Sequence, residues 1–136
     1  MDRKVAHLEL RHYSIRKIEI QDIELELEEL ELDSSPLKAQ QYSDMPKGSG
    51  ANCPNNDSLY IKRNNLLMKK KRHELRNKRV ELMVEKIDKE KEKDAVYKFY
   101  IEGKPMSTVI REMQRTQNHI KRLLSNGIDH IAKENA

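Results

Sequence analysis

The chain has 136 residues, of which 36% are hydrophobic and 37% are charged, and it contains one Phe and no Trp. This composition is too polar for a thick globular core and suits long helices that each bury one apolar stripe. No apolar run reaches the roughly 18 residues that a membrane helix requires, so we expect no membrane partner. A single cysteine and the lack of a signal-peptide pattern predict a cytoplasmic protein without disulfides.

The formal net charge of +4 at pH 7 hides a segregation of charge along the chain. Between Met1 and Asp33 the sequence has ten acidic and five basic residues. Between Lys62 and Arg79 it has nine basic residues and one acidic residue. Two segments of opposite charge in one chain indicate that they pair with each other.

The first segment, 1–33, has no Gly or Pro and predicts one long acidic helix from Arg3 to Asp33. Its later half alternates locally like a strand, but its length and its Glu and Leu content favour a helix. At about 100° per residue, the apolar residues of this half fall on two nearly opposite faces. One face holds Ile20, Ile23, Leu27 and Leu30, and the other holds Ile18, Leu25 and Leu32. A helix with two apolar faces can pack within its chain and on a second subunit, so these residues predict a homo-oligomer.

Residues 34–57 are predicted to be a flexible linker rich in Pro, Gly and Asn, because Pro36 disfavours helix in the residue before it. A second long helix, the basic one, is predicted over residues 58–93 with Asp57 or Ser58 as its N-cap. The two long helices have similar lengths and complementary charge. They therefore predict an antiparallel, coiled-coil-like helical hairpin.

The last segment, 94–136, predicts a helix-turn-helix domain. A short apolar helix ends at Gly103 and Pro105, and a second short helix covers Ser107–Met113. A turn at Gln114 and Arg115 leads to Thr116 as N-cap of a final helix over 117–133. The inner side of that helix consists of Ile120, Leu123, Leu124, Ile128 and Ile131. Two helices joined by a tight turn, the second polar at its start, are typical of helix-turn-helix proteins, and the predicted fold class is all-α.

The outer side of the final helix predicts contacts with double-stranded DNA. Side-chain amides suit adenine edges, while Lys and Arg suit guanine or phosphate. Arginines on either side of this helix suit phosphates. The predicted DNA-binding residues are Arg111, Arg115, Gln117, Asn118, Lys121, Arg122 and Ser125.

Two segments resemble a known family. Tyr100, Ile101, Glu102 and Gly103, followed by Ile110, Met113, Thr116 and Ile120, resemble the region-4-like helix-turn-helix of sigma factors. Residues 43–50, Ser-Asp-Met-Pro-Lys-Gly-Ser-Gly, are similar to a segment of small phage proteins that include the ArpU/RinA-type late-gene transcription regulators. The resemblance spans most of the chain, but only these two segments are specific. It implies a phage or prophage protein that binds a promoter in the cytoplasm of a bacterial host and contacts RNA polymerase.

The chain departs from that family pattern at three places. Gln114 stands where such sequences have Gly in the turn between the helices, and one extra residue lies between Gly103 and Ile110. Gly127 lies inside the final helix, where glycine costs about 1 kcal/mol relative to alanine.

Other sequence features have a functional and a plain interpretation. The run Lys69–Arg72 is either a nucleic-acid patch or the solvated face of a helix paired with the acidic one, and the acidic segment favours pairing. The five histidines show no spacing typical of a metal site, so we expect no metal and no cofactor. No phosphate loop or nucleophile elbow is present, which argues against an enzyme.

Two functions therefore compete. The favoured one is a sequence-specific DNA-binding transcription regulator. The alternative is a coiled-coil assembly or adaptor protein, for example a small-terminase-like packaging component or an inhibitor that binds a host protein. The charge on the outer face of the final helix and the two apolar faces of the first helix discriminate between them.

Overall fold

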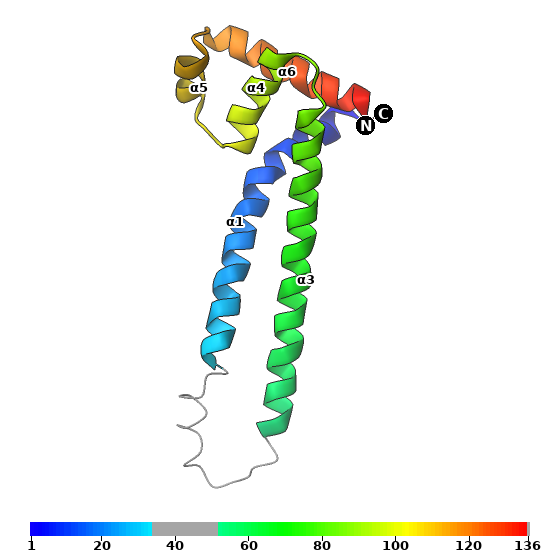
Figure 1. The fold of residues 1–136 in the computed structure, drawn as a ribbon, viewed down its shortest axis with the longest axis vertical. Helices are drawn as coiled ribbons and strands as arrows, with labels where there is room; N and C mark the ends of the chain where they lie inside the picture. Colours follow the sequence, from blue (N-terminus) through cyan, green and yellow to red (C-terminus); the bar gives the residue numbers. More distant parts are fainter. Residues whose placement is uncertain (34–51, 136) are drawn as a thin grey trace. The chain divides into compact units, whose positions relative to one another are not determined.

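The structure is a computed structural model that describes residues 1–33 and 52–135, and within these residues it contains helices and turns but no strand (Figure 1). The predicted all-α class is confirmed. The helices are α1 (Arg3–Asp33), α3 (Asn52–Glu85), α4 (Glu90–Val96), the π-helical η2 (Tyr97–Ile101), α5 (Met106–Met113) and α6 (Gln117–Glu134). None of the helices in these two ranges is long and apolar enough to cross a membrane.

The chain divides into two compact units. One unit consists of Met1–Lys17 together with Leu75–Ala136, and the other is Ile18–Glu74. Each unit therefore contains one part of α1 and one part of α3. The predicted segment 94–136 is thus only a part of a unit, which also takes in the start of α1 and the end of α3.

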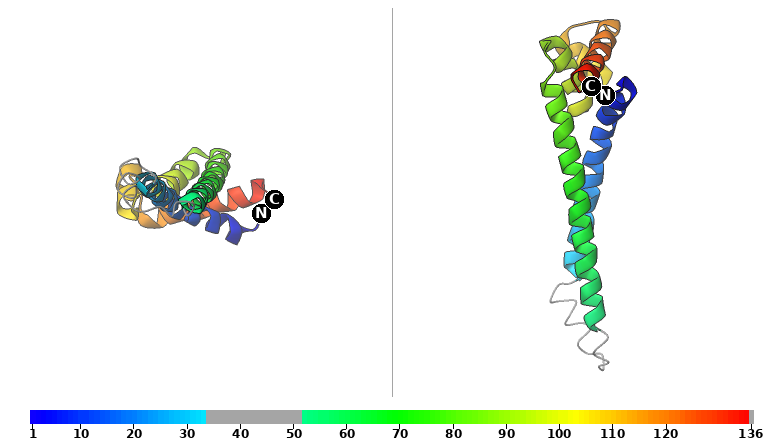
Figure 2. Two further views of the ribbon diagram at one scale, coloured as in Figure 1. Left: turned by 90° about the horizontal axis from the view of Figure 1, so that it is seen from below. Right: turned by 90° about the vertical axis from the view of Figure 1, so that its right-hand side faces the viewer.

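In the unit Ile18–Glu74, α1 and α3 lie side by side and antiparallel (Figures 1 and 2). Lys70 Nζ lies 3.3 Å from Glu24 Oε1, and His73 Nε2 lies 2.9 Å from Glu19 Oε2. Residue numbers rise along α1 as they fall along α3, which is the antiparallel order. Ion pairs at a protein surface contribute about 0.2–1 kcal/mol each, and His73 forms one only when it is protonated. These contacts therefore set the register of the two helices more than they stabilise it.

The burial of α1 in this unit follows its two apolar faces. Ile23 and Leu30 are buried, and Ile20 and Leu27, on the same face, are half-buried. On the opposite face, the exposed fractions are 66% for Ile18, 59% for Leu25 and 69% for Leu32. Within one copy of the chain, α1 therefore uses one apolar face and leaves the other exposed.

In the unit formed by 1–17 and 75–136, all the helices contribute to one apolar core. The largest fully buried side chains are Leu10, Val80, Val84, Val96, Val109, Ile120 and Ile131. The N-terminal amino group of Met1 donates to the carbonyl oxygen of Asn135 at 3.0 Å, so the two ends of the unit meet (Figure 2). A positive charge at the C-terminal end of α6 also interacts favourably with the helix dipole.

A buried polar layer joins α1 to α3 in the same unit. The Arg16 guanidinium is only 5% exposed, and it donates to Glu9 Oε2 at 2.8 Å and to Asn77 Oδ1 at 3.3 Å. Asn77 Nδ2 donates to the carbonyl oxygen of Tyr13 at 3.2 Å, and the Tyr13 hydroxyl donates to Glu81. Burial, followed by the carboxylate of Glu81, raises the pKa of Tyr13 above its usual range. Buried polar groups are stable only when they are bonded in this way.

The start of α3 differs from the prediction. The helix begins at Asn52, so residues 52–57 are helical and not linker, and neither Asp57 nor Ser58 is an N-cap. Pro54 falls in the first turn, where a backbone N–H has no acceptor within the helix, so a proline is tolerated there. The rest of the predicted linker, residues 34–51, lies outside the described residues.

The end of α3 also differs from the predicted range 58–93. The helix ends at Glu85, a turn covers residues 86–89, and α4 begins at Glu90. No Gly or Pro stands in this turn. Ile87, however, is only 3% exposed, and its N–H bonds to the carbonyl oxygen of Val84 in a tightened last turn. The helix thus ends without a Gly or Pro, at a turn whose Ile87 side chain is buried in the core.

Gly127 explains how closely α6 packs on α4. A Cβ atom at this position would lie 2.5 Å from Val96 Cγ2, well inside van der Waals contact. Val96 is fully buried, and a β-branched side chain has little rotamer freedom in a helix. The glycine inside the predicted helix is thus a packing requirement of the core.

We predict that Gly127→Ala lowers the free energy of unfolding by about 1–3 kcal/mol because it overpacks the contact with Val96. Helix propensity alone predicts the opposite sign, a gain of about 1 kcal/mol. Asn126→Ala, at an exposed position of α6, is the matched control and should be neutral or slightly stabilising. Urea unfolding followed by circular dichroism measures both changes, and a stabilised Gly127→Ala variant would contradict the packing argument.

Candidate nucleic-acid interface

A turn of three residues, 114–116, separates α5 from α6. Gln114 has φ 55° and ψ 44°, the left-handed conformation, and its backbone N–H donates to the carbonyl oxygen of Ile110. This is a common way for a helix to end, and glycine is the residue that adopts it at least cost. Gln114 is therefore a non-glycine residue in a conformation that favours glycine.

Thr116 caps α6, as predicted. Its Oγ1 atom accepts a hydrogen bond from the His119 backbone N–H at 3.3 Å. Val109 of α5 and Ile120 of α6 are both fully buried in the same core, which holds the two helices against each other. The chain changes direction sharply between them (Figure 1). The local arrangement is two short helices with a tight turn and a capped second helix.

We predict that Gln114→Gly raises the free energy of unfolding by about 0.5–1 kcal/mol, because glycine adopts positive φ without a Cβ penalty. Gln114→Ala keeps the Cβ atom and is the matched control, for which we expect no gain. Thermal and urea unfolding of the full chain measure both. Equal stabilities of the two variants would mean that residue 114 is not strained.

The first two turns of α6 divide into a buried and an exposed side. Gln117, Asn118, Lys121 and Arg122 are exposed, as are Arg111 of α5 and Arg115 of the turn. The predicted inner residues Ile120, Leu123, Leu124, Ile128 and Ile131 are all buried. Six of the seven predicted DNA-binding residues are therefore exposed, in the last turn of α5, in the turn 114–116 and in the first two turns of α6.

Ser125 is the exception among the seven. It is half-buried, and its Oγ atom accepts a hydrogen bond from Arg3 Nη2 at 2.6 Å, while Arg3 Nε contacts Asp129. Its hydroxyl therefore already has a partner within the chain. Arg3 is 122 residues away in sequence, so helical periodicity alone gave no sign of this contact.

The charge around the turn is unevenly compensated. Lys98 lies 3.2 Å from Glu112 Oε2, and Lys104 lies 2.9 Å from the same atom and 2.8 Å from Glu102 Oε2. Hydrogen bonds to Glu102 and Glu112 raise the pKa of Lys104, and those from Lys104 and Lys98 lower the pKa of Glu112. These lysines are thus largely neutralised by carboxylates.

The cations at the start of α6 lack such partners. Within residues 1–33 and 52–135, no ion pair involves Arg111, Arg115, Lys121 or Arg122. The N-terminal end of a helix adds a partial positive charge through its dipole. The exposed polar face at the start of α6 thus carries Lys121 and Arg122 without an ion-pair partner among the described residues, which is an arrangement that attracts phosphate.

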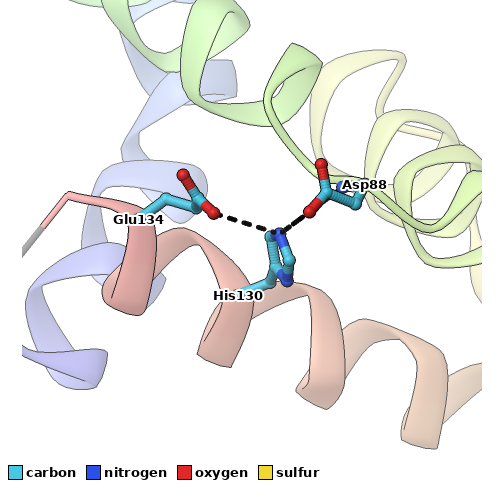
Figure 3. A group of neighbouring side chains, drawn as sticks. All are labelled: Asp88, His130 and Glu134. Carbon is cyan, nitrogen blue, oxygen red and sulfur yellow. Dashed lines mark hydrogen bonds and ion pairs between the residues drawn. The ribbon is translucent and has the colours of Figure 1, made fainter.

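One group of side chains in the described part of the chain could hold a metal ion. Asp88, in the turn after α3, and His130 and Glu134 of α6 bring their ligand atoms within 4.8 Å of one another (Figure 3). His130 Nε2 lies 3.5 Å from Asp88 Oδ2 and 3.8 Å from Glu134 Oε1. Imidazole nitrogen and carboxylate oxygen are common zinc ligands. Sequence spacing does not reveal the group, because Asp88 and His130 are 42 residues apart.

The same nitrogen of His130 has another role in this group. Nε2 accepts a hydrogen bond from the Asp88 backbone N–H at 3.4 Å, which uses the lone pair that a metal would need. Asp88 is also 78% exposed, unlike the ligands of an enclosed structural metal site. We interpret the group as a polar contact that ties the turn after α3 to α6.

We predict that His130→Ala lowers the free energy of unfolding by about 1 kcal/mol through loss of this contact. The exposed His12→Ala is the matched control, with a change within about 0.5 kcal/mol. Differential scanning fluorimetry with zinc chloride or with EDTA should give the same Tm for the unaltered chain. A zinc-dependent rise in Tm that His130→Ala removes would instead establish a metal site.

In comparisons with known proteins, no family model, curated protein or solved structure matches this chain. The resemblance to phage late-gene regulators rests on two short segments, one of which, residues 43–50, lies outside the described residues. The other segment includes Gly103, whose φ of 71° follows the end of η2, and Thr116, which caps α6. Both residues thus have a structural role at the ends of helices.

Proposed function

We propose that the chain is a sequence-specific DNA-binding transcription regulator that places α6 in the major groove. The observation that carries the proposal is the exposed face over the first two turns of α6, whose basic residues have no ion-pair partner among the described residues. A helix of this kind, polar at its start and held by a preceding helix and a tight turn, suits the major groove.

The exposed side chains suggest a division of roles. The amides of Gln117 and Asn118 match the donor and acceptor pattern of adenine, and Lys121 and Arg122 match guanine. Arg111 and Arg115 are suited to phosphates beside the groove, which position the helix without reading sequence. We assign no base contact to Ser125, because Arg3 occupies its hydroxyl.

The basic run of α3 is not needed for this function. Lys70 lies 3.3 Å from Glu24, and His73 lies 2.9 Å from Glu19, so part of the run pairs with α1. These contacts favour the interpretation of the run as one side of a helix pair. DNA affinity is accordingly proposed to depend on α5 and α6.

The paired parts of α1 and α3 are proposed to join copies of the chain. The exposed face formed by Ile18, Leu25 and Leu32 supports self-association, which would bring two or more copies of α6 to a promoter. The family resemblance supports a phage or prophage origin, a bacterial cytoplasmic location and contact with RNA polymerase. In this function the chain is a regulator and not an enzyme.

A second candidate is a coiled-coil assembly or adaptor protein, such as a packaging component or an inhibitor of a host protein. The observation that favours it is the same exposed apolar face of α1, because exposed apolar surface is typical of contacts with other proteins. In that case the exposed face of α6 would bind protein. The two candidates are separated by whether the full chain selects duplex DNA by sequence.

We predict that the full chain enriches one sequence from a randomised duplex library and that Arg122→Ala weakens its binding about 5–150-fold, the equivalent of about 1–3 kcal/mol. Lys121→Ala should also weaken it. Lys133→Ala removes the same charge at the far end of α6 and is the matched control, with little effect. Fluorescence anisotropy measures affinity, and circular dichroism verifies that helix content is unchanged.

A salt series separates specific from bulk electrostatic binding, because each lost phosphate contact reduces the slope of log K against log salt by about one. Arg111→Ala and Arg115→Ala should reduce this slope while leaving the preferred sequence unchanged. If the full chain enriches no sequence and binds no duplex at low salt, the regulator proposal fails and the adaptor candidate gains.

A further inference from the structure

The helix α3 has an exposed apolar stripe of its own. Within the unit Ile18–Glu74, Ile61 is 58% exposed and Met68 is 57% exposed, and they are separated by one heptad. The same seven-residue spacing continues along α3 to Leu75 and Leu82, which are 53% and 60% exposed. At about 100° per residue, this stripe lies nearly opposite Lys70 and His73, the residues that contact α1. Like α1, α3 packs within the chain through one side and has an exposed apolar stripe on the other side.

The charges beside the two exposed stripes have opposite signs. Asp22 and Glu29 stand next to the α1 stripe formed by Ile18, Leu25 and Leu32, and both are exposed. Lys71 and Arg72 stand next to the α3 stripe and are also exposed. Across the described ranges, none of these four charged side chains takes part in an ion pair.

The register seen inside the chain makes the two stripes match. Glu24 faces Lys70 and Glu19 faces His73 in the antiparallel pair. Suppose that the α3 helix of a second copy packs on the outer side of α1, antiparallel and with the same register to within one residue. Each apolar residue of the α3 stripe would then lie opposite an apolar residue of the α1 stripe. The matched pairs would be Ile18 with Leu75, Leu25 with Met68, Leu32 with Ile61, and Asp22 with Lys71.

Pairings of like helices lack this complementarity. Contact between two α1 outer faces would bring carboxylates together, and contact between two α3 outer faces would bring cations together. Flanking charges set partner choice and orientation in helix pairs, and like charges at close range are unfavourable. The occupant that fits the outer face of α1 is therefore the outer face of α3 from a second copy.

We propose that copies of this chain associate head to tail, with the α1 stripe of one copy packed antiparallel on the α3 stripe of the next. The proposal rests on the self-association included in the proposed function and is independent of DNA binding. Each copy carries both halves of the contact, on opposite sides of its helix pair. Such a heterologous contact generates a ring if its rotation closes, or a filament if it does not, and does not produce a twofold dimer.

Cysteine cross-linking of the full chain tests this arrangement, with Cys53→Ser as the background. Leu25→Cys and Met68→Cys are made singly and together. We expect oxidation of an equimolar mixture of the two single variants to give a cross-linked dimer, and neither variant alone to give one. The double variant should give a ladder of covalent oligomers, which ends at a fixed number for a ring.

Charge variants provide a second, independent readout. Asp22→Lys and Lys71→Asp should each weaken self-association about tenfold or more in sedimentation velocity, since attraction becomes repulsion. The double variant, and a mixture of the two single variants, should regain most of the association. Circular dichroism should be unchanged, because both positions are exposed.

Several results would overturn the proposal. Cross-linking of Leu25→Cys alone would indicate contact between two α1 helices, and cross-linking of Met68→Cys alone would indicate contact between two α3 helices. A chain that stays monomeric at all concentrations would exclude self-association altogether. These experiments contain no DNA, so a failure of head-to-tail association does not decide whether α6 binds a specific sequence. Arg122→Ala should accordingly leave the cross-linking pattern unchanged.

Discussion

The bonds of the buried Arg16 guanidinium determine how α1 lies against α3. An unpaired buried charge costs several kcal/mol, so Arg16 is tolerated only where Glu9 and Asn77 reach it. A shift of α1 by one residue would rotate Arg16 away from Asn77 and separate the Tyr13 carbonyl from the Asn77 amide. Polar contacts therefore select the register, as single buried polar groups do in coiled coils.

The core around α6 depends on a different constraint, the close approach that Gly127 allows. Because α6 lies against Val96 of α4, the inner apolar residues of α6 are buried within one unit. What remains on its first two turns is polar and basic, and Thr116 fixes where those turns begin. A helix buried along one side and left with exposed Gln, Asn, Lys and Arg on the other has little to gain from further apolar packing. This is why DNA, a polar ligand, is proposed for that face.

Helical periodicity was enough to predict the all-α class, the bounds of α1, the inner residues of α6 and the Thr116 cap, because each depends on neighbours within a few residues. It was not enough for α3. Pro54 suggested a linker although it stands in a first helical turn. The end of α3 at Glu85 has no Gly or Pro beside it, and the nearby Ile87 is buried in a core built from distant segments. Likewise, the contact of Ser125 with Arg3 and the grouping of Asp88 with His130 join residues far apart in the sequence.

The pairing of Glu24 with Lys70 and of Glu19 with His73 has a consequence for non-specific binding. A free basic helix binds any nucleic acid because phosphates displace small condensed ions, whose release is entropically favourable. Here the carboxylates of the neighbouring helix neutralise part of the positive charge in place of small ions. Unlike small ions, they cannot diffuse away when a phosphate binds. The acidic helix therefore competes with phosphate for the part of α3 that it contacts, at Lys70 and His73, and it does so at a local concentration fixed by the fold.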